Sequence, residues 1–83
     1  MDERRKRLLY RATHRGTREA DRLVGGFAQA HVETLDSTAL DQLESLLNEN
    51  DVDLVRWIGG RGEPSDAASM PVLQMMIDFK NSL

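Results

Sequence analysis

The sequence predicts an all-α fold, a small bundle of four or five helices that forms one domain over residues 1–83. Apolar residues recur at intervals of three and four through nearly every segment, which is the spacing of one helix face. No stretch of useful length alternates apolar and polar residues as a strand does. Half of the six glycines and one of the two prolines gather in one short stretch, 59–65, which is typical of a loop.

The first two expected helices lie in an arginine-rich segment. Arginines 4, 7, 11, 15, 18 and 22 recur at steps of three or four and would form one basic stripe on an unbroken helix. Gly16 lies inside this series, and glycine weakens a helix by roughly 1 kcal/mol relative to alanine. The second helix is indicated by the apolar residues Ala20, Leu23, Val24, Phe27 and Ala30, with His31 as an alternative to Ala30. The doublet Gly25-Gly26 is expected to interrupt it.

Three further helices are expected beyond residue 35. Asp36 or Ser37 can cap the next helix, which carries Leu40, Leu43, Leu46 and Leu47. Residues 48–50 end it, and Asp51 is expected to cap a short helix that carries Val52, Leu54, Val55, Trp57 and Ile58. The last helix opens at Ser65 or Ser69, with Pro71 in its first turn and Val72, Met76, Phe79 and Leu83 on its apolar face. The expected core contains Leu23, Phe27, Leu43, Leu47, Val55, Trp57 and Met76.

Composition argues against several classes of function. The chain has no cysteine, and its two histidines, His14 and His31, lack the spacing of a metal site. No apolar run approaches the roughly 18 residues of a membrane span. Because acidic residues precede any apolar segment at the start, neither a signal peptide nor a transit peptide is expected, and the bacterial cytoplasm is the expected location.

The charges are unevenly distributed along the chain. Residues 1–22 hold eight basic and four acidic side chains, a net charge of +4, and residues 23–83 hold three basic and ten acidic ones, a net charge of −7. A basic head on an acidic body favours oriented docking to a partner. The calculated pI near 5.2 argues against a nucleic-acid binder, since such domains are usually basic overall.

No catalytic constellation is present, and the chain is not expected to be an enzyme. It contains neither a nucleophile elbow nor a phosphate-binding loop. Asp51 and Asp53 lie at an expected helix start, where carboxylates interact favourably with the helix dipole, and this role explains them without acid–base chemistry.

The group Arg15, Gly16 and Glu19 has two interpretations. On a helix, Arg15 and Glu19 are i, i+4 neighbours and would form an exposed ion pair that contributes about 0.3–0.5 kcal/mol. That interpretation leaves Gly16 unexplained, because a glycine there weakens the helix. The alternative is a binding site, in which Gly16 lets another backbone approach closely.

The stretch RLLYRATHRGTREAD, residues 7–21, resembles the RGxxE signature of the small succinate dehydrogenase assembly factors, the FAD assembly factor family. The resemblance extends in order over roughly residues 7–77. It includes Asp21 and Phe27, the stretch DVDLVRW at residues 51–57, and a Gly-x-Pro at residues 62–64. RGxxE alone would be a weak signal, and its combination with Asp-x-Asp-Leu-x-x-Trp in a chain of this size is fairly specific.

The resemblance implies a five-helix bundle that acts as a chaperone. Such factors bind the flavoprotein subunit of succinate dehydrogenase, and often fumarate reductase, and assist the covalent attachment of FAD to that subunit. FAD would belong to the partner, with none bound stably by this chain, and the free chain would be a monomer. The implied partner-binding residues are Arg15, Gly16, Glu19, Arg7, Tyr10, Arg11 and Asp21.

In this interpretation Arg15 offers its donors to the partner, Glu19 offers an acceptor, and replacement of Gly16 leaves folding nearly intact. The sequence departs from the family pattern at Thr17 and Ala20, where larger apolar residues are usual, and at the Gly25-Gly26 doublet. Two rival functions remain open. A helical adaptor would bind another protein through the same basic patch, and a nucleic-acid binder would use the arginines on phosphates.

Overall fold

The computed structural model describes all of residues 1–83, and every regular element in it is helical. The elements are α1 (Glu3–Thr13), α2 (Arg18–Ala20), the π-helix η1 (Asp21–Gly25), α3 (Gly26–His31), α4 (Ser37–Leu47), α5 (Asp51–Ile58), the 3₁₀ turn η2 (Ala67–Ser69) and α6 (Met70–Asn81). Because α2, η1 and α3 follow one another without a break, they form one rod, and the chain has five helices. The predicted all-α bundle is confirmed. None of the helices has the length and apolar character needed to cross a membrane.

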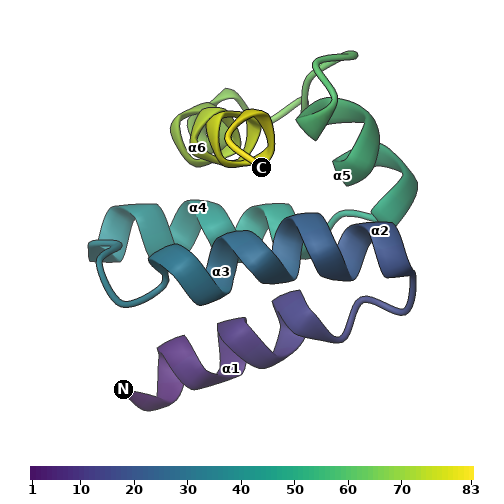
Figure 1. Ribbon diagram of the computed structural model, residues 1–83. Helices are drawn as coiled ribbons and strands as arrows, with labels where there is room; N and C mark the ends of the chain where they lie inside the picture. Colours follow the sequence, from purple (N-terminus) through teal and green to yellow (C-terminus); the bar gives the residue numbers. More distant parts are fainter.

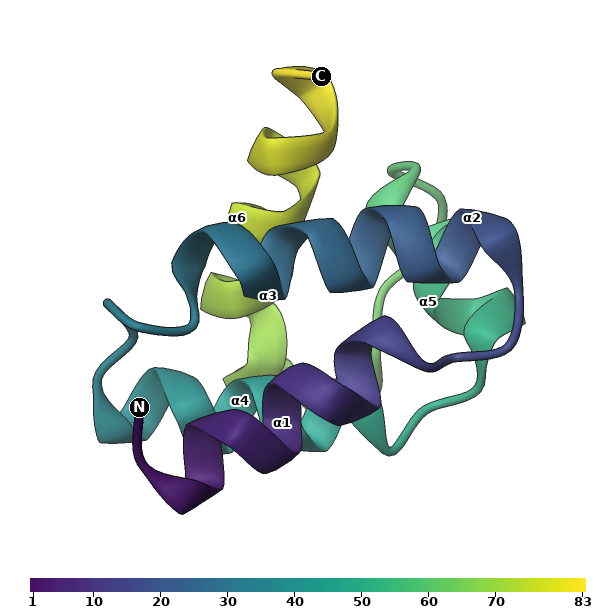
Figure 2. The same cartoon turned by 60° about the horizontal axis from the view of Figure 1, so that its bottom comes forward.

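Helix α1, the α2–α3 rod and α4 run along one another and form the body of the molecule (Figure 1). Helix α6 packs on α4 and α5 and crosses this body steeply, so that it is seen nearly end-on in Figure 1 and from the side in Figure 2. Helix α5 lies against α2, at the end of the molecule where α1 turns back into the rod. This arrangement brings two turns together, α1–α2 and α4–α5.

The hydrophobic core receives side chains from all five helices. Six of the seven expected core residues are buried: Leu23, Phe27, Leu43, Leu47, Trp57 and Met76. The expectation for Val55 is wrong in degree, because this side chain is only half-buried and lines a hollow at the surface. Leu83 does not extend the apolar face of α6, since it is 62% exposed at the chain end.

The helix starts follow the sequence with one exception. Asp36 caps α4 as expected, because its side chain accepts a hydrogen bond from the backbone N–H of Ala39 at 2.8 Å. Helix α5 is capped by Asn50, whose Oδ1 accepts from the N–H of Asp53 at 2.9 Å. The expectation that Asp51 is the cap is therefore wrong. Asp51 is the first helical residue, and its carboxylate is available for another contact.

The glycine doublet packs helices together and does not interrupt the rod, contrary to the expectation. Gly25 and Gly26 both have right-handed helical backbone angles. A Cβ on Gly25 would lie 3.1 Å from the carbonyl oxygen of Ala12 in α1, and one on Gly26 would lie 3.2 Å from the ring of Phe79 in α6. The two glycines thus let α1 and α6 approach the same rod closely.

The arginine series does not form a continuous basic stripe. Helix α1 ends at Thr13, and two of its arginines turn toward α4. Nη2 of Arg4 lies 2.5 Å from Oδ1 of Asp41 and 3.3 Å from Oε1 of Glu44, and the hydrogen bond to Asp41 raises the pKa of Arg4. Arg11 donates to Oδ1 of Asn48 at 2.7 Å. Part of the basic head therefore binds the acidic body of its own chain.

Arg5 fastens the start of α1 in the same way. Its side chain donates to the backbone carbonyl oxygens of Val32 at 2.9 Å and Leu35 at 2.5 Å, in the turn between α3 and α4. It also forms an ion pair with Asp2, the N-cap of α1. Two hydrogen bonds from Arg5 lower the pKa of Asp2, and the one from the backbone N–H has a larger effect than the one from the side chain.

Candidate functional site

The Arg-Gly pair of the signature lies in the turn between α1 and α2. Gly16 has a φ of +103°, a backbone conformation that residues with a side chain rarely adopt. The helix therefore stops at Thr13 and restarts at Arg18, so Arg15 and Glu19 are not i, i+4 neighbours on one helix. The surface ion pair is not formed. The positive φ also contradicts the expectation that replacing Gly16 leaves folding nearly intact, because any side chain there strains the backbone.

The guanidinium of Arg15 is bound within the chain, at the turn between α4 and α5. Its Nε donates to Oδ1 of Asp51 at 2.7 Å, Nη1 donates to the carbonyl oxygen of Leu47 at 2.7 Å, and Nη2 donates to that of Glu49 at 2.6 Å. Only 10% of the side chain is exposed. Three of its five N–H donors are thus used internally.

Asp21 also makes an internal contact, as Arg11 does with Asn48. Oδ1 of Asp21, at the start of η1, accepts a hydrogen bond from the backbone N–H of Arg15 at 2.7 Å. This bond fixes the main chain of the α1–α2 turn at Arg15, while the side chain of Arg15 binds the turn between α4 and α5. Thr17 completes the local structure, because its Oγ1 accepts from the N–H of Ala20 and caps α2.

Four of the implied site residues face solvent and are not committed to an ion pair: Gly16, Glu19, Arg7 and Tyr10. Glu19 and Arg7 have no side-chain hydrogen bond within the chain. A Cβ on Gly16 would meet no atom within 4 Å, so the space beside it is open. Tyr10 is 63% exposed, and its ring stacks on His14 with ring centroids 4.0 Å apart.

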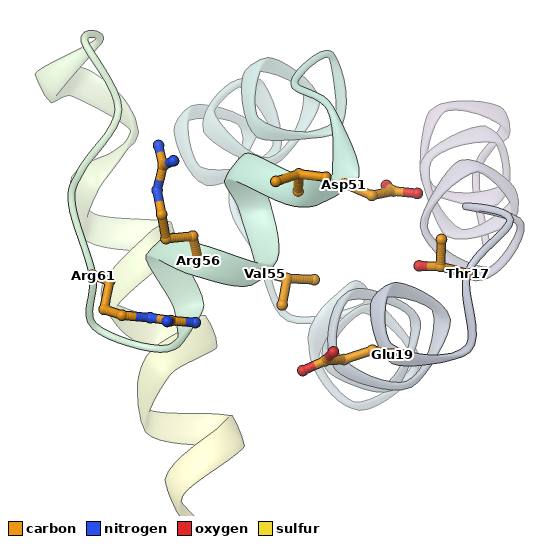
Figure 3. Close-up of a pocket in the computed structure, with 7 residues that line it drawn as sticks. Thr17, Glu19, Asp51, Val55, Arg56 and Arg61 are labelled. Atoms are coloured by element: carbon orange, nitrogen blue, oxygen red, sulfur yellow. The ribbon is translucent and has the colours of Figure 1, made fainter.

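Two open hollows flank the Arg15–Asp51 pair. The first, of about 480 Å³, lies between α2 and α5 and is lined by Thr17, Glu19, Asp51, Val52, Val55, Arg56 and Arg61. In Figure 3, Glu19 from α2 and Val55 from α5 lie on adjacent walls, and Asp51 points toward Thr17. The second hollow, of about 470 Å³, is lined by Tyr10, Arg11, His14, Arg15, Asn50 and Asp51. Asp51 therefore lines both hollows, and Arg15 lines the second.

Sequence reasoning missed the contribution of α5 to this surface. The sequence predicts Asp51 as a helix cap and places Val52 among the apolar residues that indicate the helix, yet Val52 is 74% exposed and lines the first hollow. One signal was available in the sequence. Val52 lies outside the i, i+3, i+4 pattern set by Leu54, Trp57 and Ile58, so a side chain there points away from the core.

The α1–α2 turn and the two hollows near it have features that suit contact with another protein. Together they present a bare backbone at Gly16, a free carboxylate at Glu19, and two exposed apolar side chains, Tyr10 and Val52. Aromatic side chains surrounded by polar groups are typical of interface anchors. No histidine or cysteine lines the first hollow, and no group of three or more metal-ligating side chains occurs in the structure.

Comparison with known proteins gives one family. The family model described as "Flavinator of succinate dehydrogenase" matches residues 6–80. The "FAD assembly factor SdhE" of Acetobacter pasteurianus is 39% identical over 75 residues, which cover 90% of this chain and 69% of that protein. No solved structure matches the chain.

Mitochondrial proteins from eukaryotes match as well. "Succinate dehydrogenase assembly factor 2, mitochondrial" of Candida glabrata is 40% identical over 58 residues, 70% of this chain and 38% of that protein. The protein of the same name from Dictyostelium discoideum is 32% identical over 76 residues, 92% of this chain and 54% of that protein. The chain thus spans about two thirds of its bacterial relative and between a third and a little over half of these mitochondrial ones. Since the family model covers nearly the whole chain, this protein belongs to the family of flavinators of succinate dehydrogenase.

Proposed function

We propose that this chain is an assembly factor that binds the flavoprotein subunit of succinate dehydrogenase and promotes the covalent attachment of FAD to it. Family membership supports the proposal, as do the names of the bacterial and mitochondrial relatives. The observation that carries it is the exposure of both Gly16 and Glu19, three residues apart where the chain enters α2. The first offers open backbone and the second a carboxylate that no group in the chain binds.

The physical role of each group follows from its exposure. At Gly16 the partner's backbone can lie against this chain with no side chain between them. Glu19 supplies an acceptor for a donor on the partner, and Tyr10 supplies an amphipathic ring whose stacking on His14 limits its motion. Arg7 adds a long-range attraction that steers association.

The proposed action on the partner is a shift of its conformational population. A flavoprotein with a mobile domain samples open and closed arrangements, and a factor that binds the closed one more tightly increases its population. A differential affinity of a few kcal/mol is sufficient for a large shift. The residue of the flavoprotein that becomes attached to FAD then meets the flavin more often, and the bond forms between groups of the partner alone.

In this proposal the chain is not an enzyme and does not hold FAD by itself. The flavin and the attachment chemistry belong to the flavoprotein. A strand–turn–helix unit for a dinucleotide is foreign to an all-helical bundle of this size. The free factor acts as a monomer in the bacterial cytoplasm.

The test measures covalent flavin on the partner. Cells that lack their own assembly factor are complemented with each variant, and the denatured flavoprotein subunit is examined by in-gel flavin fluorescence. Glu19→Gln is expected to reduce the signal at least several-fold with an unchanged melting temperature, because it removes a charged acceptor from a desolvated interface. Glu33→Gln is the matched control, since Glu33 is also exposed and unpaired and lies in the turn that follows the far end of the rod.

Three results would contradict the proposal. Full flavinylation with Glu19→Gln would remove Glu19 from the working surface. Co-purification of a protein other than a flavoprotein from the native host would favour an adaptor. Micromolar binding of FAD by the isolated chain, detected as quenching of flavin fluorescence, would identify a flavin carrier.

A further inference from the structure

We propose that Arg15 is a positioning residue that acts through Asp51, and that this pair sets the shape of the docking surface without itself contacting the partner. The inference rests on the proposed function, in which Gly16 and Glu19 meet the flavoprotein. Asp51 lies outside the RGxxE segment, and the inference gives it a role together with that segment in forming the docking surface.

The contacts of Arg15 join two turns that are more than thirty residues apart in sequence. The carbonyl oxygens of Leu47 and Glu49 lie on either side of the end of α4, and the carboxylate of Asp51 begins α5. All three acceptors lie within 2.7 Å of a guanidinium nitrogen. On the other side, Asp21 holds the Arg15 main chain at 2.7 Å. The α1–α2 turn is thereby fixed to the α4–α5 turn through one residue.

This junction contributes to the distance between the two walls of the first hollow, beside the direct packing of α2 on α5. Glu19 follows Arg15 by four residues on one wall, while Val52 and Val55 follow Asp51 on the other. No hydrogen bond or ion pair joins α2 to α5 directly, so the Arg15–Asp51 pair is the polar link between the walls. If the link is lost, the carboxylate of Glu19 and the apolar rim at Val52 lose their relative position.

The pair is partly buried, and the internal hydrogen bonds that occupy the guanidinium argue against a direct role in binding. Arg15 is 10% exposed and Asp51 21% exposed, whereas Glu19 and Val52 face solvent. A partner that took over the guanidinium would have to leave two carbonyl oxygens and one carboxylate without donors. Loss of one member of a buried charged pair is strongly unfavourable, because the other remains uncompensated.

The test combines a double-mutant cycle in the free protein with binding measurements. Arg15→Gln, Asp51→Asn and the double variant are compared by thermal unfolding, and their affinity for the flavoprotein subunit is measured at low temperature, where circular dichroism shows each variant fully folded. Asp53→Asn is the matched control, since it also removes a carboxylate from the first turn of α5, one that pairs with Arg56 instead.

Arg15→Gln is expected to lower the melting temperature by about 10 °C or more, given the usual cost of breaking such a pair in a domain of this size. The double variant is expected to melt close to Arg15→Gln, because the contact that Asp51→Asn weakens is one of the three that Arg15→Gln already removes. In the folded state, each single variant and the double variant should bind the flavoprotein at least tenfold more weakly than the unsubstituted chain. Asp53→Asn should show additivity with Arg15→Gln and retain affinity.

Two outcomes would overturn the inference. Additive melting shifts for Arg15 and Asp51 together with weakened binding would make Arg15 a direct contact of the partner. Coupled melting shifts with unchanged affinity of the folded variants would make the pair a stabilising feature alone. If the unsubstituted chain itself fails to bind the flavoprotein, the proposed function fails, and the cycle in the free protein still reports whether the pair exists.

Discussion

The positive φ of Gly16 makes a quantitative prediction for Gly16→Ala. A methyl group at this position would meet no atom within 4 Å, so the substitution causes no clash. Its entire effect on stability comes from holding an L-residue at φ +103°, which costs on the order of 1–3 kcal/mol. For a domain of 60–100 residues each kcal/mol lowers the melting temperature by about 4–8 °C. We therefore expect a decrease of at least about 4 °C.

The assay is thermal and urea-induced unfolding of the isolated chain, followed by circular dichroism. The urea midpoint should fall while the slope of the transition stays the same, because the substitution leaves the buried surface unchanged. Unfolding of Gly16→Ala at the same temperature as the unsubstituted chain would refute the reasoning. It would mean that the turn relaxes to a negative φ at no cost, and that glycine is not needed there for folding.

Gly16→Arg then separates the backbone effect from the effect of bulk. Because the space beside Gly16 is open, the longer side chain should destabilise the free chain by about as much as alanine does. Its effect on covalent flavin should be larger, since an arginine holds the partner's backbone away and a methyl group does so much less. Equal flavinylation by the alanine and arginine variants, compared at a temperature where both are folded, would place Gly16 outside the interface.

Two further predictions concern packing. Trp57→Ala should destabilise the chain by about 3–5 kcal/mol, because a large buried side chain is lost. Trp57→Phe should cost much less in urea unfolding, since it keeps most of the apolar volume and removes a buried indole N–H that has no hydrogen-bond partner. Equal losses of stability for the two variants would contradict this prediction. Gly25→Ala should destabilise the chain by roughly 1–2 kcal/mol, because the overpacking cost against the backbone of Ala12 exceeds the gain in helix propensity. Gly26→Ala should be nearly neutral, because the ring of Phe79 can move; a reversed order of the two glycine variants in thermal unfolding would refute the close-packing interpretation.

The helices could be predicted from the sequence because their signals are local. The periodic leucines of α4 and the aspartate before it lie within one segment, and each points to the same element. The wrong prediction of the α5 cap also comes from local signals. Asn50 and Asp51 are both good caps, so their order along the chain does not decide which one is used.

The candidate site could be predicted only in part. The RGxxE resemblance identified the exposed residues Gly16 and Glu19. The position of the Arg15 side chain could not be predicted in the same way, because most of its acceptors cannot be recognised from residue types. Two of the three are backbone carbonyl oxygens, which every residue possesses. The contact also requires α1 to stop before Arg15, and a single glycine in a helical pattern does not determine whether the helix bends, continues or ends. Long-range geometry therefore decided what local patterns left open.

The use of carbonyl oxygens by Arg15 has a consequence for how the α4–α5 turn tolerates change. Replacing the side chain of Glu49 leaves its carbonyl oxygen in place, so the residue type at this exposed position is free to vary, whereas the number of residues in the turn is fixed. Adding or removing one residue between Leu47 and Asp51 would displace the acceptors relative to one another by up to about 3.8 Å, the distance between consecutive Cα atoms, and no rotation of a rigid guanidinium could follow. Homologous turns that keep this arginine contact should therefore agree in number of residues, while the residue type at the position of Glu49 should vary.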